Sequence, residues 1–373
     1  PQSDEARRLL IGLLVRSGNP VRAITVAEDG ARQSPRNSEW PLTIGSIQQL
    51  NGKQDEAIAS FDRAFATEPD EGTLLRSVDA RLQKTPSDWA GIANVLRANA
   101  KLVAGSPPLQ GALAASLVNT KQRDAGLQAL RNAYTNIKDG VAKQTYRADI
   151  WEVWYSAVIQ SFLNQPKEAE AFVKATIGGQ TPDFYAARGL ARIWRAEGKP
   201  GLDNAFKYFE DAVVQAKDSP DLAASALIEA GEAAYVEGLC ERSVPFFERA
   251  IAVAPNSAPS LNNAAYVTAK CGNAPEKAIA WAQKAVELAP QVADLQDTLG
   301  FVMMKTGKPE EALAPLQKAV TMSPAPASLL HLAEALAATG RKDEARAMLE
   351  RTRSMKLNAE QTAEREQFEK TLQ

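Results

Sequence analysis

The sequence predicts an all-α protein, a right-handed α-solenoid of about ten helix-turn-helix hairpins with a C-terminal capping helix. Glycines recur in its C-terminal half at Gly238, Gly272, Gly307 and Gly340, which are 34, 35 and 33 residues apart. Small residues also recur at two fixed places in each period, and a proline follows most periods. A period of this length is typical of hairpins that bury their apolar faces only by stacking on their neighbours. We therefore expect an extended surface suited to binding.

The composition is that of an ordinary folded protein, with 45% hydrophobic and 24% charged residues among 373. Lys and Arg number 43 and Asp and Glu number 45, and neither sign forms long blocks. We expect no nucleic-acid partner, because phosphate binding needs a basic stripe. We also expect no membrane insertion by this segment, because no apolar run approaches the roughly 20 residues that span a bilayer.

The most regular units are expected over 224–357. From Ala293, one period places Leu299, Gly300, Met303, Ala312, Leu316, Ala319 and Pro324 at the recurring positions. Small residues such as Gly300 and Ala312 let the two helices of a hairpin approach closely, and a bulky residue such as Leu316 fills the space beside them.

The N-terminal part repeats this pattern less strictly. Units are expected over 1–140, where Gly45 and Phe61 occupy equivalent positions, and degenerate, aromatic-rich units over 141–223. A final helix over 358–373 is charged enough to face water, so we expect it to cap the open end of the solenoid.

These positions resemble tetratricopeptide-repeat (TPR) proteins over essentially the full length. In the last 100 residues, the segments Leu261–Tyr266, Leu288–Pro290, Asp297–Phe301 and Leu330–Ala333 resemble the closing repeats of bacterial TPR proteins associated with exosortase and exopolysaccharide export. That resemblance implies a non-enzymatic scaffold or adaptor with a protein or peptide partner in a bacterial cell-envelope assembly. The expected location is the periplasm or the outer membrane, with the cytoplasm as the alternative.

Because the sequence begins at Pro1 and not at a methionine, we expect a processed or excised piece of a longer protein. A signal peptide, a lipid anchor or further repeats would then lie outside it.

The resemblance also suggests where a partner would bind. First-helix groove positions of the C-terminal units are held by amides, acids, aromatics and a lysine, namely Asn262, Asn263, Tyr266, Asp294, Asp297, Phe301 and Lys305. Exposed side chains of these kinds on one concave wall suit an extended or helical peptide with some basic character. The alternative is a solvated groove with the partner bound elsewhere.

A second candidate site is an aromatic stripe formed by Trp151, Trp154 and Tyr155. With Val158 and Phe162 these residues follow the spacing of one side of a helix. Packing in the core is the favoured interpretation, but aromatic faces also stack on sugars or anchor peptides. A carbohydrate-binding component of polymer export is therefore an alternative function, and a regulatory arm of a larger enzyme is another.

We expect no enzyme, no cofactor and no metal site. His331 is the only histidine, so a catalytic serine or cysteine could use no other histidine as its general base. Two cysteines and one histidine cannot fill a four-ligand zinc site without a carboxylate, and no phosphate-binding glycine motif is present.

The two cysteines, Cys240 and Cys271, fall in the turns of adjacent units. Adjacent units place such turns side by side, so a disulfide is possible if the Cα atoms lie within about 7 Å. A bridge would indicate an oxidising compartment such as the periplasm. Two unpaired cysteines in small positions near the turns are the equal alternative.

Overall fold

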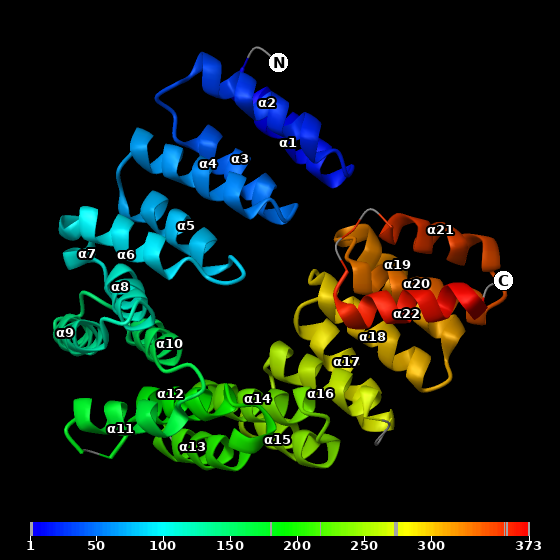
Figure 1. Ribbon diagram of the computed structural model, residues 1–373. Coiled ribbons are helices and arrows are strands. Elements are labelled where there is room, and N and C mark those ends of the chain that lie inside the picture. Colours follow the sequence, from blue (N-terminus) through cyan, green and yellow to red (C-terminus); the bar gives the residue numbers. More distant parts are fainter. Residues whose placement is uncertain are drawn as a thin grey trace. The chain divides into compact units, whose positions relative to one another are not determined.

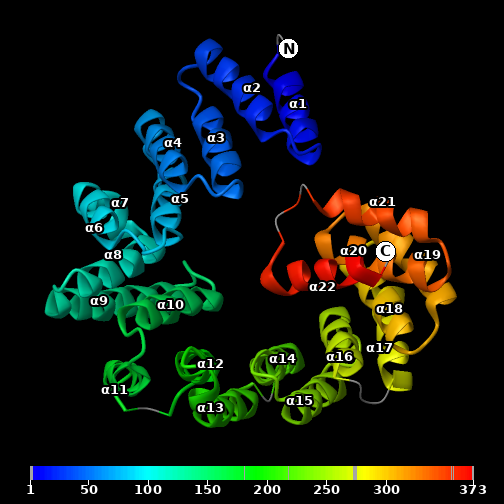
Figure 2. The same cartoon turned by 45° about the vertical axis from the view of Figure 1, so that its right-hand side comes forward.

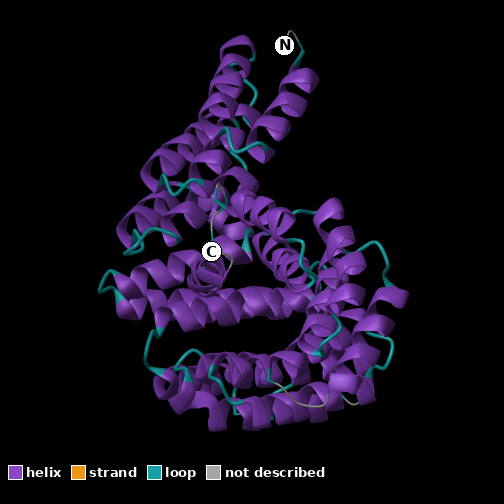
Figure 3. Ribbon diagram, turned by 90° about the vertical axis from the view of Figure 1, so that its right-hand side faces the viewer, coloured by secondary structure: helices purple, strands orange, loops and turns teal. Residues whose placement is uncertain are grey.

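The computed structural model describes residues 3–179, 181–216, 218–271, 275–353, 355 and 357–371. All regular structure in these residues is helical, and Figure 3 shows no strand among them. The chain forms two compact units, Pro1–Thr181 and Pro182–Gln373 (Figure 1). Each unit is a stack of helix hairpins, so the predicted all-α solenoid is confirmed. The finer division into four segments stays a prediction.

Five hairpins form the first unit. Its helices are α1 (Asp4–Arg16), α2 (Pro20–Gln33), α3 (Glu39–Leu50), α4 (Gln54–Thr67), α5 (Glu71–Leu82), α6 (Trp89–Ala98), the short α7 (Ala100–Gly105), α8 (Pro107–Asn119), α9 (Arg123–Ala142), the 3₁₀ turn η1 (Ala148–Ile150), α10 (Trp151–Ser161) and α11 (Pro166–Thr176).

The second unit contains five more hairpins, which brings the described total to the ten that the sequence predicts. Its helices are α12 (Phe184–Arg195), the 3₁₀ turn η2 (Lys199–Gly201), α13 (Leu202–Gln215), α14 (Pro220–Val236), α15 (Cys240–Val253), α16 (Ala258–Lys270), α17 (Pro275–Leu288), α18 (Ala293–Lys305), α19 (Pro309–Met322), α20 (Pro326–Ala338), α21 (Lys342–Thr352) and α22 (Ala359–Thr371).

Close helix packing explains the small residues of the repeat. A Cβ atom added to Gly300 in α18 would lie 2.3 Å from Cγ of Leu316 in α19. In the first unit, a Cβ atom added to Gly45 would lie 2.7 Å from the ring of Phe61. The glycine and the bulky residue are 16 positions apart in both hairpins, so each glycine admits the bulky side chain of its own second helix.

Turn glycines separate the two helices of the regular hairpins. Gly238 and Gly307 have φ values of 74° and 76°, a region that side chains resist. Gly272, and with it the insertion predicted beside it, lies outside the described residues.

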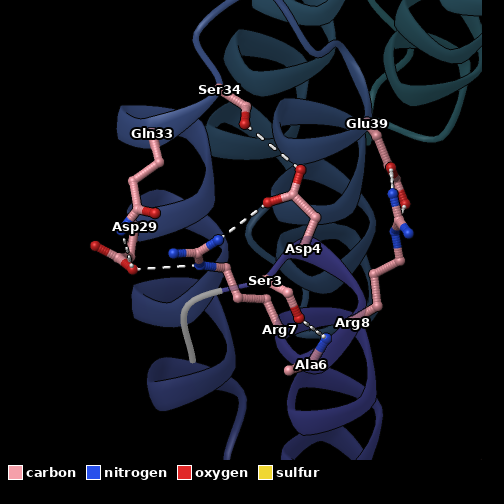
Figure 4. Close-up of polar contacts among 9 residues, drawn as sticks. All are labelled: Ser3, Asp4, Ala6, Arg7, Arg8, Asp29, Gln33, Ser34 and Glu39. Carbon is pink, nitrogen blue, oxygen red and sulfur yellow. Dashed lines mark hydrogen bonds and ion pairs between the residues drawn. The ribbon is translucent and has the colours of Figure 1, made fainter.

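A polar network ties together the start of the first unit (Figure 4). The buried guanidinium of Arg7 in α1 donates to Asp4 at 3.0 Å and to Asp29 of α2 at 3.3 Å. On the exposed side, Arg8 forms two hydrogen bonds with Glu39 of α3. These contacts join the first hairpin internally and to the next one.

In the second unit, the first helices of successive hairpins lie side by side. α14 contacts α16, α16 contacts α18, and α18 contacts α20, as can be followed in Figure 2. We call the surface formed by the adjoining side chains of α14, α16, α18 and α20 the inner wall. Helices on the inner side of a curved stack approach one another most closely, so this wall is the candidate groove.

The predicted C-terminal helix is present as α22. Asn358 caps α22, because its side chain accepts a hydrogen bond from the Gln361 amide at 2.8 Å. The helix packs against α20, and its Glu364 reaches Lys270 of α16. The predicted C-terminal helix is therefore present on the last hairpin, and it also reaches the inner wall.

Within the described part of the chain, no helix combines the length and the apolar character that a bilayer crossing requires.

Candidate partner-binding wall

An aromatic ladder runs across the inner wall, with one ring from each first helix. Ring centroids of Tyr235 (α14) and Tyr266 (α16) are 6.4 Å apart, those of Tyr266 and Phe301 (α18) 4.9 Å, and those of Phe301 and His331 (α20) 4.8 Å. Such ring pairs add roughly 0.5–1.5 kcal/mol beyond the area that they bury. The ladder therefore holds four hairpins in register along one surface.

The predicted amides lie between α14 and α16. Asn263 donates to Glu232 of α14 at 3.1 Å, and Asn262 contacts Asn263 at 3.4 Å. The carboxamide oxygen of Asn262 is buried without a hydrogen-bond partner among the described residues. Burial raises the pKa of Glu232, although the charge of Arg195 acts in the opposite direction.

The predicted acids lie on α18. Asp297 contacts Nδ1 of His331 through both carboxylate oxygens, at 3.0 and 3.1 Å. Asp294 is exposed one turn earlier, and the two acids border a small cavity of about 50 Å³ beside Ser323. The only histidine of the chain is thus a wall residue that orients an acid.

Phe301 corrects the prediction of exposed aromatics, because its side chain is only 2% exposed. Tyr266 is half-buried. Two lysines lie over the Phe301 ring, Lys270 with its Nζ atom at 5.9 Å and Lys305 at 5.3 Å from the centroid. Lys305 also pairs with Glu334 of α20 at 3.5 Å. The wall is therefore acidic at the start of α18 and basic at the ends of α16 and α18.

A buried carboxylate continues the wall toward α12. Glu229 of α14 accepts hydrogen bonds from Nε of Arg188 at 2.7 Å and from Nε of Arg192 at 2.8 Å. Burial acts to raise the pKa of Glu229, but the Arg192 hydrogen bond and the Arg188 charge outweigh it and leave the pKa lowered. Glu229 is thus ionised and clamped, which fixes α12 against α14.

The aromatic stripe of α10 belongs to the core of the first unit. Trp154 is 1% exposed and Tyr155 is 3% exposed, and the indole N–H of Trp154 donates to the Leu130 carbonyl at 2.8 Å. Trp151 is half-buried, with its ring 5.1 Å from that of Tyr134. Stacking on a sugar needs an open ring face, so the carbohydrate-binding interpretation of this stripe is wrong for Trp154 and Tyr155.

Cys240 and Cys271 form a disulfide in the structure, with their Cα atoms 5.7 Å apart. Cys240 begins α15 and Cys271 directly follows α16. The bridge therefore joins two consecutive hairpins, just beyond the end of α16 that carries Lys270.

Sequence reasoning missed several wall residues, namely Tyr235, Glu229, Lys270 and His331. One signal was available, because Tyr235, Tyr266, Phe301 and His331 recur at spacings of 31, 35 and 30 residues, close to the period of the repeat. Another was the basic spacing of Arg188, Arg192 and Arg195 along α12, which marks one side of that helix.

The fold and the wall define a helical-repeat protein whose second unit carries a continuous inner surface. Residues 303–361 match a family model described as "Tetratricopeptide repeat". This match and the recurring hairpins support a TPR protein. No curated protein matches the chain.

Several solved structures are similar over part of the chain. They include "YrrB: a TPR protein with an unusual peptide-binding site" (18% identity, 54% of this chain, 97% of that chain, TM-score 0.37) and TTC0263, a thermophilic TPR protein in Thermus thermophilus (20%, 49%, 97%, TM-score 0.38). A third is MamA from Desulfovibrio magneticus RS-1 (19%, 46%, 94%, TM-score 0.36). Identities and TM-scores at this level transfer none of these proteins' binding properties.

Proposed function

We propose that the chain is a non-enzymatic scaffold whose inner wall binds a protein or peptide partner. One observation carries this proposal. The polar and aromatic residues that the sequence predicts as groove residues lie on the neighbouring helices α16 and α18, and they contact α14 and α20. A wall that combines a ring ladder with separate acidic and basic ends suits an elongated peptide or helix. The basic part of the partner would face Asp294 and Asp297, and its acidic part would face Lys270 and Lys305.

We further propose that this scaffold works outside the cytoplasm, in the periplasm or at the outer membrane. The disulfide between Cys240 and Cys271 supports an oxidising compartment. The resemblance of the last 100 residues supports an assembly that exports exopolysaccharide or surface proteins. Alkylation and intact-mass measurement of protein from its native compartment tests this location, and two freely alkylated thiols would contradict it.

Replacement of three wall residues together tests the binding function. Asn263→Ala, Asp294→Ala and Asp297→Asn should weaken capture of partners from native extract at least several-fold. Asparagine at 297 keeps a group that can hydrogen-bond with His331. Circular dichroism should show unchanged helicity.

A matched control removes exposed charges from other helices of the same unit. Glu276→Ala, Glu287→Ala and Glu310→Ala lie on α17 and α19, outside the inner wall. This control should capture partners as the wild type does. Equal capture by the control and the wall variant would exclude the inner wall as the binding surface.

A further inference from the structure

The C-terminal helix α22 lies on the inner wall in the manner of a bound helix. Its Glu364 pairs with Lys270 of α16 at 3.2 Å, across 94 positions of sequence. It packs against α20, and Phe368 packs against the apolar cluster that contains Leu330. Side chains of α22 therefore meet α16 and α20, and they face Phe301 and Lys305 of α18 across a cavity.

One side of α22 faces the inner wall and the cavity beside it. Glu364, Gln367, Phe368 and Thr371 are spaced i, i+3, i+4 and i+7, which places them on one side of a helix. This is the spacing with which amphipathic helices enter grooves on other proteins. Glu366, on the opposite side, is exposed.

The fit between α22 and the wall is incomplete. A cavity of about 470 Å³ remains between them, with Phe301, Lys305, Leu330, His331 and Glu334 on the wall side. Phe368 is only half-buried, and it is the one aromatic residue of a helix that is otherwise polar and small. A helix with a larger apolar face would fill more of this space and bury more of the ladder.

We propose that the inner wall over α16, α18 and α20 is a helix-binding groove which α22 occupies in cis, and that a partner helix must displace α22 to bind. This inference rests on the proposed function of the wall. The partner is an amphipathic helix with an acidic residue opposite Lys270 and a bulky aromatic residue four positions later, in the place of Glu364 and Phe368. The charges of Lys270 and Lys305 over the Phe301 ring select the acid, and the cavity accommodates the aromatic ring.

A labelled peptide with the sequence of residues 357–371 serves as the probe. Fluorescence anisotropy would measure its affinity for the full chain as wild type, Glu364→Lys and Phe368→Ala. Each substitution weakens a different contact of α22, so each should raise the population of open wall. Because the apparent dissociation constant scales inversely with that population, both variants should bind the probe at least about tenfold more tightly than the wild type. Glu366→Lys makes the same charge change on the exposed side of α22 and should bind as the wild type does.

Carbodiimide cross-linking reports the position of α22 directly. It should form an amide between Lys270 and Glu364 in the wild type, and labelled probe added to Phe368→Ala should reduce that product. The pair between Lys277 and Glu248, at 2.9 Å on α17 and α15, is the control that should not respond.

Equal probe affinity for all four proteins would overturn cis occupancy, as would absence of the Lys270–Glu364 product where the control pair reacts. The two proposals fail separately. Unchanged probe affinity with lost capture by the Asn263, Asp294 and Asp297 variant leaves the wall as the binding surface and rejects the role of α22. Tighter probe binding with unchanged capture by that variant supports the groove and rejects the partner contacts proposed for those three residues.

Discussion

Aromatic residues follow one another along the single helix α10, whereas in the second unit they lie one per hairpin across four helices. Along α10, Trp154 and Tyr155 are buried, and Trp154 donates a hydrogen bond to Leu130 of α9. Across the second unit, Tyr266 and His331 belong to a ladder on the inner wall. Aromatic residues repeated at helical spacing thus pack within one hairpin and its neighbours, and those repeated at the period of the solenoid line up across successive hairpins.

Removal of Trp154 should give the largest effect, because the comparison assigns it to the core. Trp154→Ala leaves a cavity and removes the indole hydrogen bond to the Leu130 carbonyl, so the free energy of unfolding should fall by about 3–5 kcal/mol. Urea denaturation measures this loss. Trp151→Ala, at the half-buried end of the stripe, should lower the free energy of unfolding clearly less. Equal losses for the two variants would contradict the assignment of Trp154 to the core.

The disulfide should stabilise the part of the second unit that carries the ladder, because it joins the two hairpins that contain Tyr235 and Tyr266. Replacement of Cys240 and Cys271 by serine should lower stability by about 2–4 kcal/mol, since the bridge constrains an unfolded loop between residues 31 positions apart. Thermal melts of the wild type with and without reductant should show the same loss. An unchanged melting temperature of the wild type after reduction would contradict a stabilising role of the disulfide.

Close packing behind the ladder predicts a smaller loss at Gly300. Gly300→Ala forces Leu316 to move and should cost about 1–3 kcal/mol. Gly12→Ala is the matched control, because a Cβ atom there meets only the end of Arg16 at 3.6 Å. Alanine should stabilise α1 at that position by roughly 0.5–1 kcal/mol. Changes of the same sign at both positions would show that the register is misassigned.

The buried ion pairs of Glu229 should contribute more to stability than an exposed ion pair does. Its pKa is lowered, so it stabilises the fold above its unfolded pKa, near 4.5, and this contribution is lost as the pH falls through the folded value. Glu229→Gln should therefore cost about 1–3 kcal/mol at pH 7 and progressively less below about pH 4.5. The exposed pair of Arg8 and Glu39 provides the control, and Glu39→Gln should cost about 0–1 kcal/mol. A pH-independent difference for Glu229→Gln would reject the ionised clamp.

The sequence predicted the hairpins because their cause is local and periodic. Gly300 and Leu316, 16 positions apart, contact each other in a way that recurs in the repeat. The same period put Asn263 and Asp297 on neighbouring first helices, and the structure brings them to one wall.

Contacts that lie outside this period could not be predicted. The pair of Lys270 and Glu364 spans 94 positions, and no recurring spacing in the sequence predicts it. Phe301 was expected to be exposed because its slot faces the groove, but it packs against Ala265 and Ala269 of α16, and Lys270 and Lys305 lie over its ring. The repeat pattern of the sequence therefore does not predict where α22 packs.

Site-specific photo-cross-linking tests the central claim most directly, that the inner wall and not the aromatic stripe meets the partner. Benzoylphenylalanine would replace Tyr266 in one protein and Trp151 in another, since both side chains are aromatic and half-buried. After irradiation in native extract, we predict a covalent protein adduct from position 266 and none from position 151. An adduct from position 151 with none from position 266 would contradict the account.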